Sequence, residues 1–203
     1  MPPAKIVITR HGQTESNRDD LIMGRSDARL TRQGIETVRD LSRVIAAEGV
    51  RYIISSTLGR AALTAAIHSE QLGVPVSFSE AVAELSCGIW EGRPREQVVA
   101  GSGPIRGTWR FRPPGGESYL DGEARVSSLV RDILGMTDRR AVLLVGHAAV
   151  NRVLMKLLLD LDPDEAMTIR FPHDAIHVVE HARDVRYASI SGMCGDGILK
   201  EPK

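Results

Sequence analysis

The chain has 203 residues, of which 42% are hydrophobic and 26% are charged, close to the average soluble globular protein. This composition excludes a disordered chain, a fibrous repeat and a small cysteine-rich scaffold, and the length favours a single domain over residues 1–203. Because 26 Lys and Arg residues balance 26 Asp and Glu residues, the net charge is zero, which argues against a dedicated nucleic-acid binder.

Strand and helix patterns alternate through the first part of the chain. β-Branched runs predict strands, and apolar residues at helical spacing predict the helices between them. Thr31 is a suitable N-cap for the first long helix, and Gly49 and Gly73 fit helix stops. Pro75 indicates that the third strand lies at a sheet edge or that the proline stands at the start of the strand. The expected strands are 5–9, 51–55 and 74–78, and the expected helices are 31–48 and 58–72.

The middle of the chain differs because prolines and glycines interrupt it. It predicts loops with one short helix near 95–100, and we expect a lid insertion over about 85–117. Alternation then returns, with helices expected at 117–134 and 148–159 and strands at 141–145, 175–180 and 185–191, the last two as a hairpin. In the first of these helices, the residues expected to face inward are Leu120, Val126, Leu129, Val130 and Ile133.

Strands separated by helices are typical of βαβ units. The pattern therefore predicts an α/β fold, a three-layer sandwich whose central sheet is mostly parallel and carries helices on both faces. The run at 141–145 is apolar throughout, as expected for a strand buried on both sides.

Two cysteines, Cys87 and Cys194, lie far apart and form neither a CxxC pair nor a disulfide framework. The N-terminal segment has no long apolar core, so we expect no signal peptide. The apolar stretches are too short or too interrupted to span a bilayer. A cytoplasmic protein that does not bind membranes is the expectation.

Cationic and imidazole side chains follow three of the predicted strands. Arg10 and His11 follow the first, Arg60 opens the helix after the second, and His147 follows the strand at 141–145. Ligand sites in open α/β sheets form beyond the carboxyl ends of the strands, where helix N-termini add N–H donors. Forked guanidinium donors match phosphate oxygens, so these residues predict a phosphoryl-binding pocket.

Six segments of the chain carry motifs in a fixed order. They are 10–17 (RHGQTESN), 24–34 (GRSDARLTRQG), 55–65 (SSTLGRAALTA), 84–92 (ELSCGIWEG), 113–118 (PPGGES) and 145–147 (VGH). Together they resemble the histidine phosphatase superfamily, in its phosphoglycerate-mutase-like branch. One short motif would be weak evidence, but six in the right order over most of the chain are specific. The resemblance implies the three-layer α/β sandwich expected above.

The resemblance implies a role for each catalytic position. His11 would be the nucleophile that forms a phosphohistidine, and Glu84 would protonate the leaving group and then activate water. Glu80, Glu91 and Glu96 compete with Glu84 for that role. The remaining catalytic and phosphate- or substrate-binding positions are Arg10, Arg60, His147, Asn17, Gln13, Thr14, Gly24 and Arg110.

Three arginines in the middle segment, Arg106, Arg110 and Arg112, lie around Trp109. They are either a solvated basic loop or contacts for a second anionic group of the substrate. The substrate itself stays open among phosphorylated small acids, sugar phosphates and the phosphate of a cobamide precursor. The expected partners are a small phosphoester and inorganic phosphate, without nucleic acid; monomer and homodimer both remain open.

The same pocket could hydrolyse an ester or return the phosphoryl group to a second hydroxyl. The resemblance implies that glycolytic mutases of the family carry a long insertion after the W-E-G segment. Glu84 and His147 are close in this sequence, so we expect that insertion to be absent or shortened here. A short lid admits water, which favours a phosphomonoesterase of the short-lid phosphatase type. A phosphoglycerate mutase and an inactive phospholigand-binding module are the alternatives.

No metal or cofactor is expected, because guanidinium and imidazole groups supply the positive charge that Mg²⁺ supplies elsewhere. His173, His177 and His181 are spaced by four, as metal ligands on a helix can be. The β-branched run at 176–179 predicts a strand instead, so we expect these histidines not to form a metal site.

Overall fold

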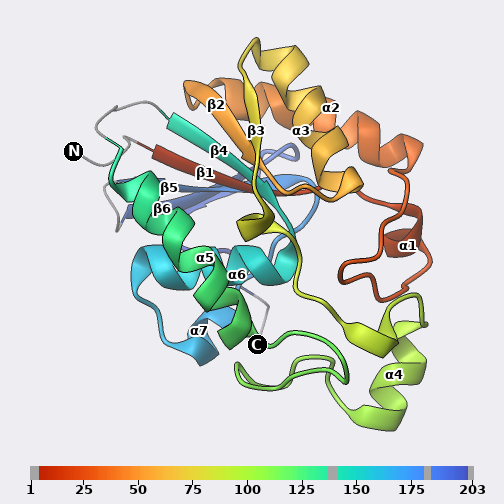
Figure 1. Ribbon diagram of the computed structural model, residues 1–203. Helices are drawn as coiled ribbons and strands as arrows, with labels where there is room; N and C mark the ends of the chain where they lie inside the picture. Colours follow the sequence, from red (N-terminus) through yellow and green to blue (C-terminus); the bar gives the residue numbers. More distant parts are fainter. Residues whose placement is uncertain (1–4, 137–140, 181–183, 201–203) are drawn as a thin grey trace.

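The computed structural model describes residues 5–136, 141–180 and 184–200. A seven-stranded sheet forms the middle layer, in the order β3-β2-β4-β1-β5-β6-β7 (Figure 1). The expected α/β class is confirmed. The strands are β1 (Lys5–Arg10), β2 (Val50–Ser55), β3 (Val76–Phe78), β4 (Ala141–Gly146), β5 (Ala175–Glu180), β6 (Asp184–Ser189) and β7 (Cys194–Asp196).

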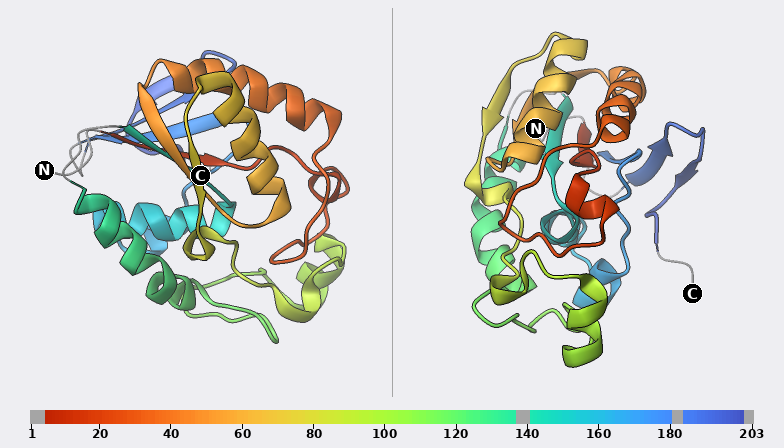
Figure 2. Two further views of the ribbon diagram at one scale, coloured as in Figure 1. Left: turned by 45° about the horizontal axis from the view of Figure 1, so that its top comes forward. Right: turned by 90° about the vertical axis from the view of Figure 1, so that its right-hand side faces the viewer.

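Helices cover both faces of the sheet, as expected. Figure 2 shows α2 and α3 on one side and α5, α6 and α7 on the other. The helices are α1 (Glu15–Arg18), α2 (Arg32–Ala46), α3 (Gly59–Leu72), α4 (Arg95–Ser102), α5 (Tyr119–Leu134), α6 (Ala148–Leu159) and α7 (Pro163–Met167), with 3₁₀ turns η1 (Glu80–Val82) and η2 (Gly88–Trp90).

The sheet is mixed rather than mostly parallel. β3, β2, β4 and β1 pair in parallel, whereas β1–β5, β5–β6 and β6–β7 pair antiparallel. A parallel neighbour requires a crossover of a dozen or more residues, usually a helix. The connections after β5 and β6 are too short for that, so the end of the chain extends the sheet by hairpins.

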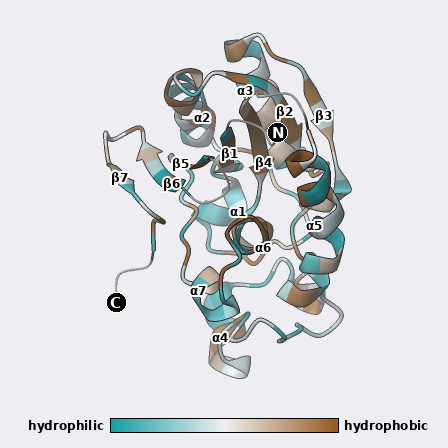
Figure 3. Cartoon of the chain, turned by 90° about the vertical axis from the view of Figure 1, so that its left-hand side faces the viewer, coloured by the Kyte–Doolittle hydropathy of each residue, from teal (hydrophilic) through white to brown (hydrophobic). Residues whose placement is uncertain are grey.

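Successive side chains of a strand point to opposite faces of the sheet and pack in two separate hydrophobic cores. Ile6 and Ile8 of β1 pack with α5 and α6, whereas Val7 packs with α2 and α3. This division follows from the two-residue period of a strand. β4 and much of α6 are apolar in Figure 3, and every residue of β4 is buried. The buried centre of the sheet therefore leads directly to the carboxyl ends of β1 and β4.

Local signals explain where several elements begin and end. The Thr31 side chain accepts a hydrogen bond from the Gly34 N–H and caps α2, and Gly73 ends α3 with a φ of +66°. β3 lies at the sheet edge, as Pro75 predicted. The short α1, α7 and β7 were not expected, because fewer than six residues carry no clear period.

One inward-facing prediction in α5 is wrong. Leu120 is 43% exposed, and its neighbour Tyr119 is buried instead. The helix begins at Tyr119, capped by Ser118, and the Tyr119 ring stacks on Trp109 at 4.5 Å between ring centroids. That stacking occupies the inward position of the first turn.

None of the helices in the described part of the chain has the length and apolar character that a bilayer span requires.

Candidate functional site

The ends of β1, β2 and β4 meet at one edge of the sheet. The ladder continues past the strands, because the His11 N–H donates to Gly146 O and the Ser56 N–H donates to Val145 O, each at 3.0 Å. His147 follows Gly146 and occupies the N-cap position of α6, where its side chain makes no capping hydrogen bond. These backbone bonds bring His11, Ser56 and His147 together.

The His11 imidazole has a defined tautomer. Its Nδ1 lies 2.8 Å from Gly12 O, and because a carbonyl can only accept, Nδ1 carries the proton. The side chain is 2% exposed, and burial, with His147 and Arg10 nearby, holds the pKa of His11 well below its usual value. The ring is therefore neutral near pH 7, and its Nε2 keeps a lone pair.

His147 is fully buried, with its ring centroid 5.0 Å from that of His11. Its Nε2 lies 2.8 Å from Ser56 Oγ, and its buried Nδ1 has no hydrogen-bond partner within the described residues. Burial and the charges of Arg60 and Arg10 lower the pKa of His147 well below its usual value. An unpartnered buried nitrogen beside His11 is a position from which a bound group could be contacted.

Arg10 ends β1 and lines the pocket next to His11. Its Nη1 donates to Phe171 O at 3.4 Å, and its buried Nε has no partner among the described residues. Burial lowers the pKa of Arg10 to about 10, so the guanidinium remains charged at neutral pH. A buried cation with unused donors is a strong attraction for an anion.

Arg60 lies in the first turn of α3 and is 2% exposed. It donates to Gly24 O at 2.8 Å, to Ser26 O at 2.6 Å and to Asp27 at 3.3 Å, so it also fastens the loop at 24–27. Gly24 adopts a φ of +54°, and a Cβ there would lie 2.6 Å from the Cys87 nitrogen. Glycine is therefore required where this loop borders the pocket.

The predicted residues of the 10–17 segment divide into two groups. Asn17 lines the pocket, whereas Gln13 and Thr14 do not. The Asn17 Oδ1 accepts from the Thr14 N–H and hydroxyl at 3.1 and 2.9 Å, which leaves its amide nitrogen as the available donor. Gln13 instead accepts from the Thr31 hydroxyl at 3.0 Å. Thr14 therefore orients the Asn17 side chain, and Gln13 holds the neighbouring loop through Thr31.

Glu84 is the single carboxylate among the described residues that line the pocket. Its oxygens accept from the N–H groups of Leu85 at 2.9 Å, Val150 at 3.1 Å and Ala149 at 3.2 Å. The carboxylate therefore lies against the N-terminus of α6. Of its competitors, Glu80 and Glu96 are exposed, and none of Glu80, Glu91 and Glu96 lines the pocket.

Glu91 has a structural task. Its carboxylate accepts from the N–H groups of Arg25, Ser26 and Cys87 at 2.7–2.9 Å, which joins the loop at 24–27 to η2. Burial alone would raise the pKa of Glu91, but these hydrogen bonds hold it below its usual value.

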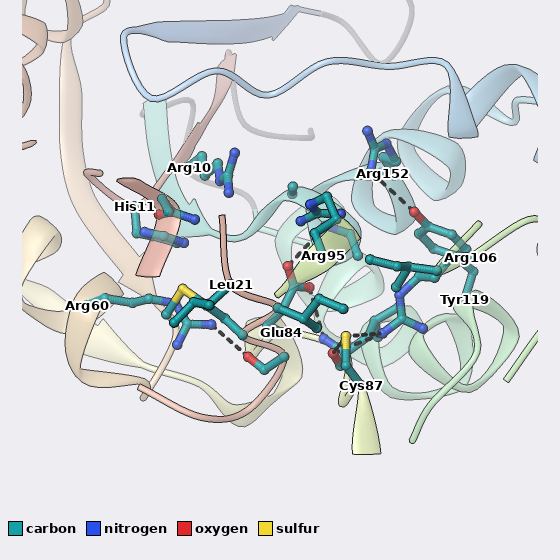
Figure 4. Close-up of a pocket in the computed structure, with 18 of the residues that line it drawn as sticks. Arg10, His11, Leu21, Arg60, Glu84, Cys87, Arg95, Arg106, Tyr119 and Arg152 are labelled. Carbon is teal, nitrogen blue, oxygen red and sulfur yellow. Dashed lines mark hydrogen bonds between the residues drawn. The ribbon is translucent and has the colours of Figure 1, made fainter. Parts of the chain in front are cut away.

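The pocket has a volume of about 350 Å³ and carries five arginines against one carboxylate (Figure 4). This volume is at the low end for small-molecule sites and suits a compact ligand. Of Arg106, Arg110 and Arg112, only Arg106 lines it. Arg110 lies on a separate surface hollow beside Lys156, and Arg112 pairs with Asp121 at 2.6 Å. The structure therefore does not bring Arg110 to the predicted site.

Three residues at the site were not anticipated. His173 donates its Nδ1 proton to His11 O at 2.6 Å, and Arg95 and Arg152 line the pocket. Arg152 is a half-buried polar position on amphipathic α6 and shows no motif in the sequence. His173 belongs to the histidine series considered above, and its proximity to His11 depends on the β1–β5 pairing.

The histidine series does not converge on a metal site within the described residues. His177 is buried on β5, where the strand was expected, and His173 lies against His11. His181 lies outside the described residues. No group of three His, Cys, Asp or Glu side chains in the described ranges is arranged to hold a metal ion.

Fold and site together define an α/β protein whose sheet-edge pocket is lined by His11 and by arginines, with His147 packed against His11. More particularly, the chain belongs to the histidine phosphatase superfamily (branch 1), whose family model matches residues 6–189. A relative named probable phosphoglycerate mutase GpmB, from Salmonella paratyphi B, is 27% identical over 190 residues, which is 91% of this chain and 88% of the relative.

Solved structures share the fold. A mycobacterial glucosyl-3-phosphoglycerate phosphatase in complex with VO3 has a TM-score of 0.78 and 25% identity, and the match covers 98% of this chain and 100% of the other. A putative alpha-ribazole-5'-P phosphatase from Escherichia coli K-12 has a TM-score of 0.78 at 19% identity, over 98% and 97% of the two chains.

Proposed function

We propose that this chain is a phosphomonoesterase that hydrolyses a small phosphorylated metabolite through a phosphohistidine on His11. The observation that carries the proposal is the hydrogen bond from His11 Nδ1 to Gly12 O. It leaves the lone pair on Nε2 of a neutral ring, the form that an imidazole nucleophile needs. The arginines beside this nitrogen are the donors that a phosphoryl group requires.

In the first step, His11 Nε2 attacks phosphorus, the N–P bond forms and the P–O bond to the alcohol breaks. A protonated Glu84 gives its proton to the departing oxygen, so the alcohol leaves neutral. In the second step, Glu84 takes a proton from water, whose oxygen attacks phosphorus while the N–P bond breaks. Inorganic phosphate leaves, and both side chains return to their starting states.

Positive charge for this chemistry comes from the chain itself. Arg10 and Arg60 line the pocket at the same end as His11, and Asn17 adds a neutral amide donor. Phosphoryl transfer depends mainly on positioning and on electrostatic stabilisation of the equatorial oxygens. These groups support turnover without a metal ion.

The test is hydrolysis of p-nitrophenyl phosphate at about pH 6 in excess EDTA by wild type and His11→Ala. We expect turnover in the wild type and a loss of at least about 1,000-fold in the variant. Acid-labile, alkali-stable phosphate on a peptide containing His11 should accumulate after rapid denaturation. Equal activity of the two proteins would refute the proposal.

A mutase is the second candidate, and the named relatives at 27% identity favour it. In that case the phosphoryl group on His11 would return to a second hydroxyl of the same substrate rather than pass to water. Conversion between 2- and 3-phosphoglycerate faster than phosphate release would establish this alternative. Phosphate release exceeding conversion would support the phosphatase.

A further inference from the structure

The pocket has two ends with different tasks. In Figure 4, Arg10, His11 and Arg60 lie at one end, and Arg106, Tyr119 and Arg152 lie at the other. Glu84 and Arg95 lie between them. Since the first end holds the proposed nucleophile, the second end faces the part of the substrate that leaves.

Arg106 is committed to the fold. Its Nη2 donates to Leu85 O and Ser86 O, each at 3.0 Å, and its Nη1 donates to Glu117 O. Its guanidinium also lies 5.7 Å from the centre of the Tyr119 ring. These bonds hold the chain around Glu84 and leave Arg106 few donors for a ligand.

Arg152 is arranged differently. Its Nε donates to Ile169 O at 2.9 Å and its Nη1 donates to the Tyr119 hydroxyl at 3.3 Å, both neutral acceptors. Within the described residues no carboxylate pairs with it. Because both acceptors are neutral, they do not offset the positive charge of this half-buried guanidinium. The charge is therefore available to an anion in the pocket.

The charge balance of the pocket points the same way. Five guanidiniums and one carboxylate line it, and Arg95 also pairs with Asp20 outside the lining set. A phosphoryl dianion compensates the charges of Arg10 and Arg60. The charge of the half-buried Arg152 then has no counterpart within the described residues, and a cation withdrawn partly from water without a partner is destabilising.

We propose that Arg152, positioned by Tyr119 and flanked by Arg95, binds a second anionic group of the substrate. This proposal rests on the proposed function. It assigns the substrate to a class, small phosphomonoesters that carry a carboxylate or a second phosphate. A carboxylate and a phosphate each present two oxygens that can accept paired N–H bonds from a guanidinium, so either group fits beside Arg152.

The experiment compares substrates that differ only in that group. 3-Phosphoglycerate is set against glycerol 3-phosphate, and fructose 1,6-bisphosphate against fructose 6-phosphate. In the wild type we expect kcat/KM to be at least about tenfold higher for the member of one pair that carries the second anionic group. A tenfold preference is the equivalent of one good charged hydrogen bond. The pair that shows the preference identifies the anion.

Arg152→Met keeps most of the side-chain bulk and removes the charge. It should abolish the preference by lowering kcat/KM for the member that carries the second anionic group, with less than about twofold change for the member that lacks it. Tyr119→Phe, which leaves Arg152 present and removes only its hydroxyl partner, should lower the preference in the same direction. Arg39→Met, at an exposed position of α2, is the control, and a melting temperature verifies that each variant is folded.

Two results would overturn the inference. The first is that the wild type prefers neither 3-phosphoglycerate nor fructose 1,6-bisphosphate over its partner, and the second is that Arg152→Met lowers kcat/KM equally for both members of a pair. The second result would assign Arg152 to the phosphoryl group or to the fold. Both leave the proposed function intact if p-nitrophenyl phosphate is hydrolysed. Absence of that hydrolysis in the wild type would refute the proposed function together with this inference.

Discussion

Among single residues, Glu84 has the role that substrate chemistry tests most directly. Glu84→Gln keeps the side-chain volume and can still accept from the α6 N–H groups, but it cannot donate and recover a proton. We expect a loss of about 100-fold or more on an alkyl phosphate and a much smaller loss on p-nitrophenyl phosphate, whose leaving group needs little protonation. Steady-state rates on both esters check this, and equal losses would argue against the acid role.

His173 stabilises the backbone of the proposed nucleophile, His11. Its Nδ1–H bonds the His11 carbonyl at 2.6 Å, and burial lowers the pKa of His173 to about 3, so the ring stays neutral. His173→Ala should lower kcat about tenfold with little change in KM, because it leaves that carbonyl unpaired. His173→Asn places an amide donor near the Nδ1 position and should retain most of kcat. If Asn restores nothing, the hydrogen bond is not what positions His11.

At the scale of elements, the segment that carries Glu84 is fastened from α5. Arg125 Nη1 donates to the carbonyls of Glu80, Ala81 and Ala83 at 2.7–2.9 Å, just before Glu84. Just after Glu84, the Glu117 carboxylate accepts from the Ser86 N–H at 2.8 Å. A side chain on a turn has no regular ladder to fix it, so these bonds set the direction of Glu84.

The Arg125 bonds can be removed without touching the pocket. Arg125→Met should reproduce part of the Glu84→Gln pattern, with a loss of about tenfold on alkyl phosphates and less on p-nitrophenyl phosphate. Arg131→Met, at an exposed position of the same helix, should have no effect. Parallel losses on both ester classes would mean that Arg125 serves stability alone.

Elements with a clear period could be predicted from the sequence, and those fixed by tertiary context could not. The apolar repeats gave α6 and β5 with the bounds seen in the structure, and Thr31 indicated the start of α2. The antiparallel half of the sheet and the β1–β5 contact that brings His173 to His11 depend on pairing between distant segments. Likewise, the motifs indicated the phosphoryl end of the pocket, whereas Arg152 looks like any polar residue of an amphipathic helix.

For the whole molecule, buried neutral histidines couple stability to pH. Burial lowers the pKa of His68 to about 4 and that of His177 to about 4, in two different parts of the core. The unfolded chain, with histidine pKa values near 6.5, binds more protons than the folded chain between those values. The stabilisation is therefore complete above about pH 6.5 and is lost as the pH falls toward the folded pKa values.

The expected size follows from the same linkage. At pH 5 each such histidine should cost about 2 kcal/mol of unfolding free energy relative to pH 7.5, since one pKa unit corresponds to about 1.4 kcal/mol. Urea unfolding at pH 7.5 and 5.0 measures it, and His68→Gln, which cannot titrate, should show a smaller difference between the two pH values. An unchanged difference would place His68 outside the linkage. Because burial also holds the pKa of His11 well below its usual value, protonation of the nucleophile should begin at a lower pH than it does for an ordinary histidine, and activity measured over the same pH range as unfolding tests this.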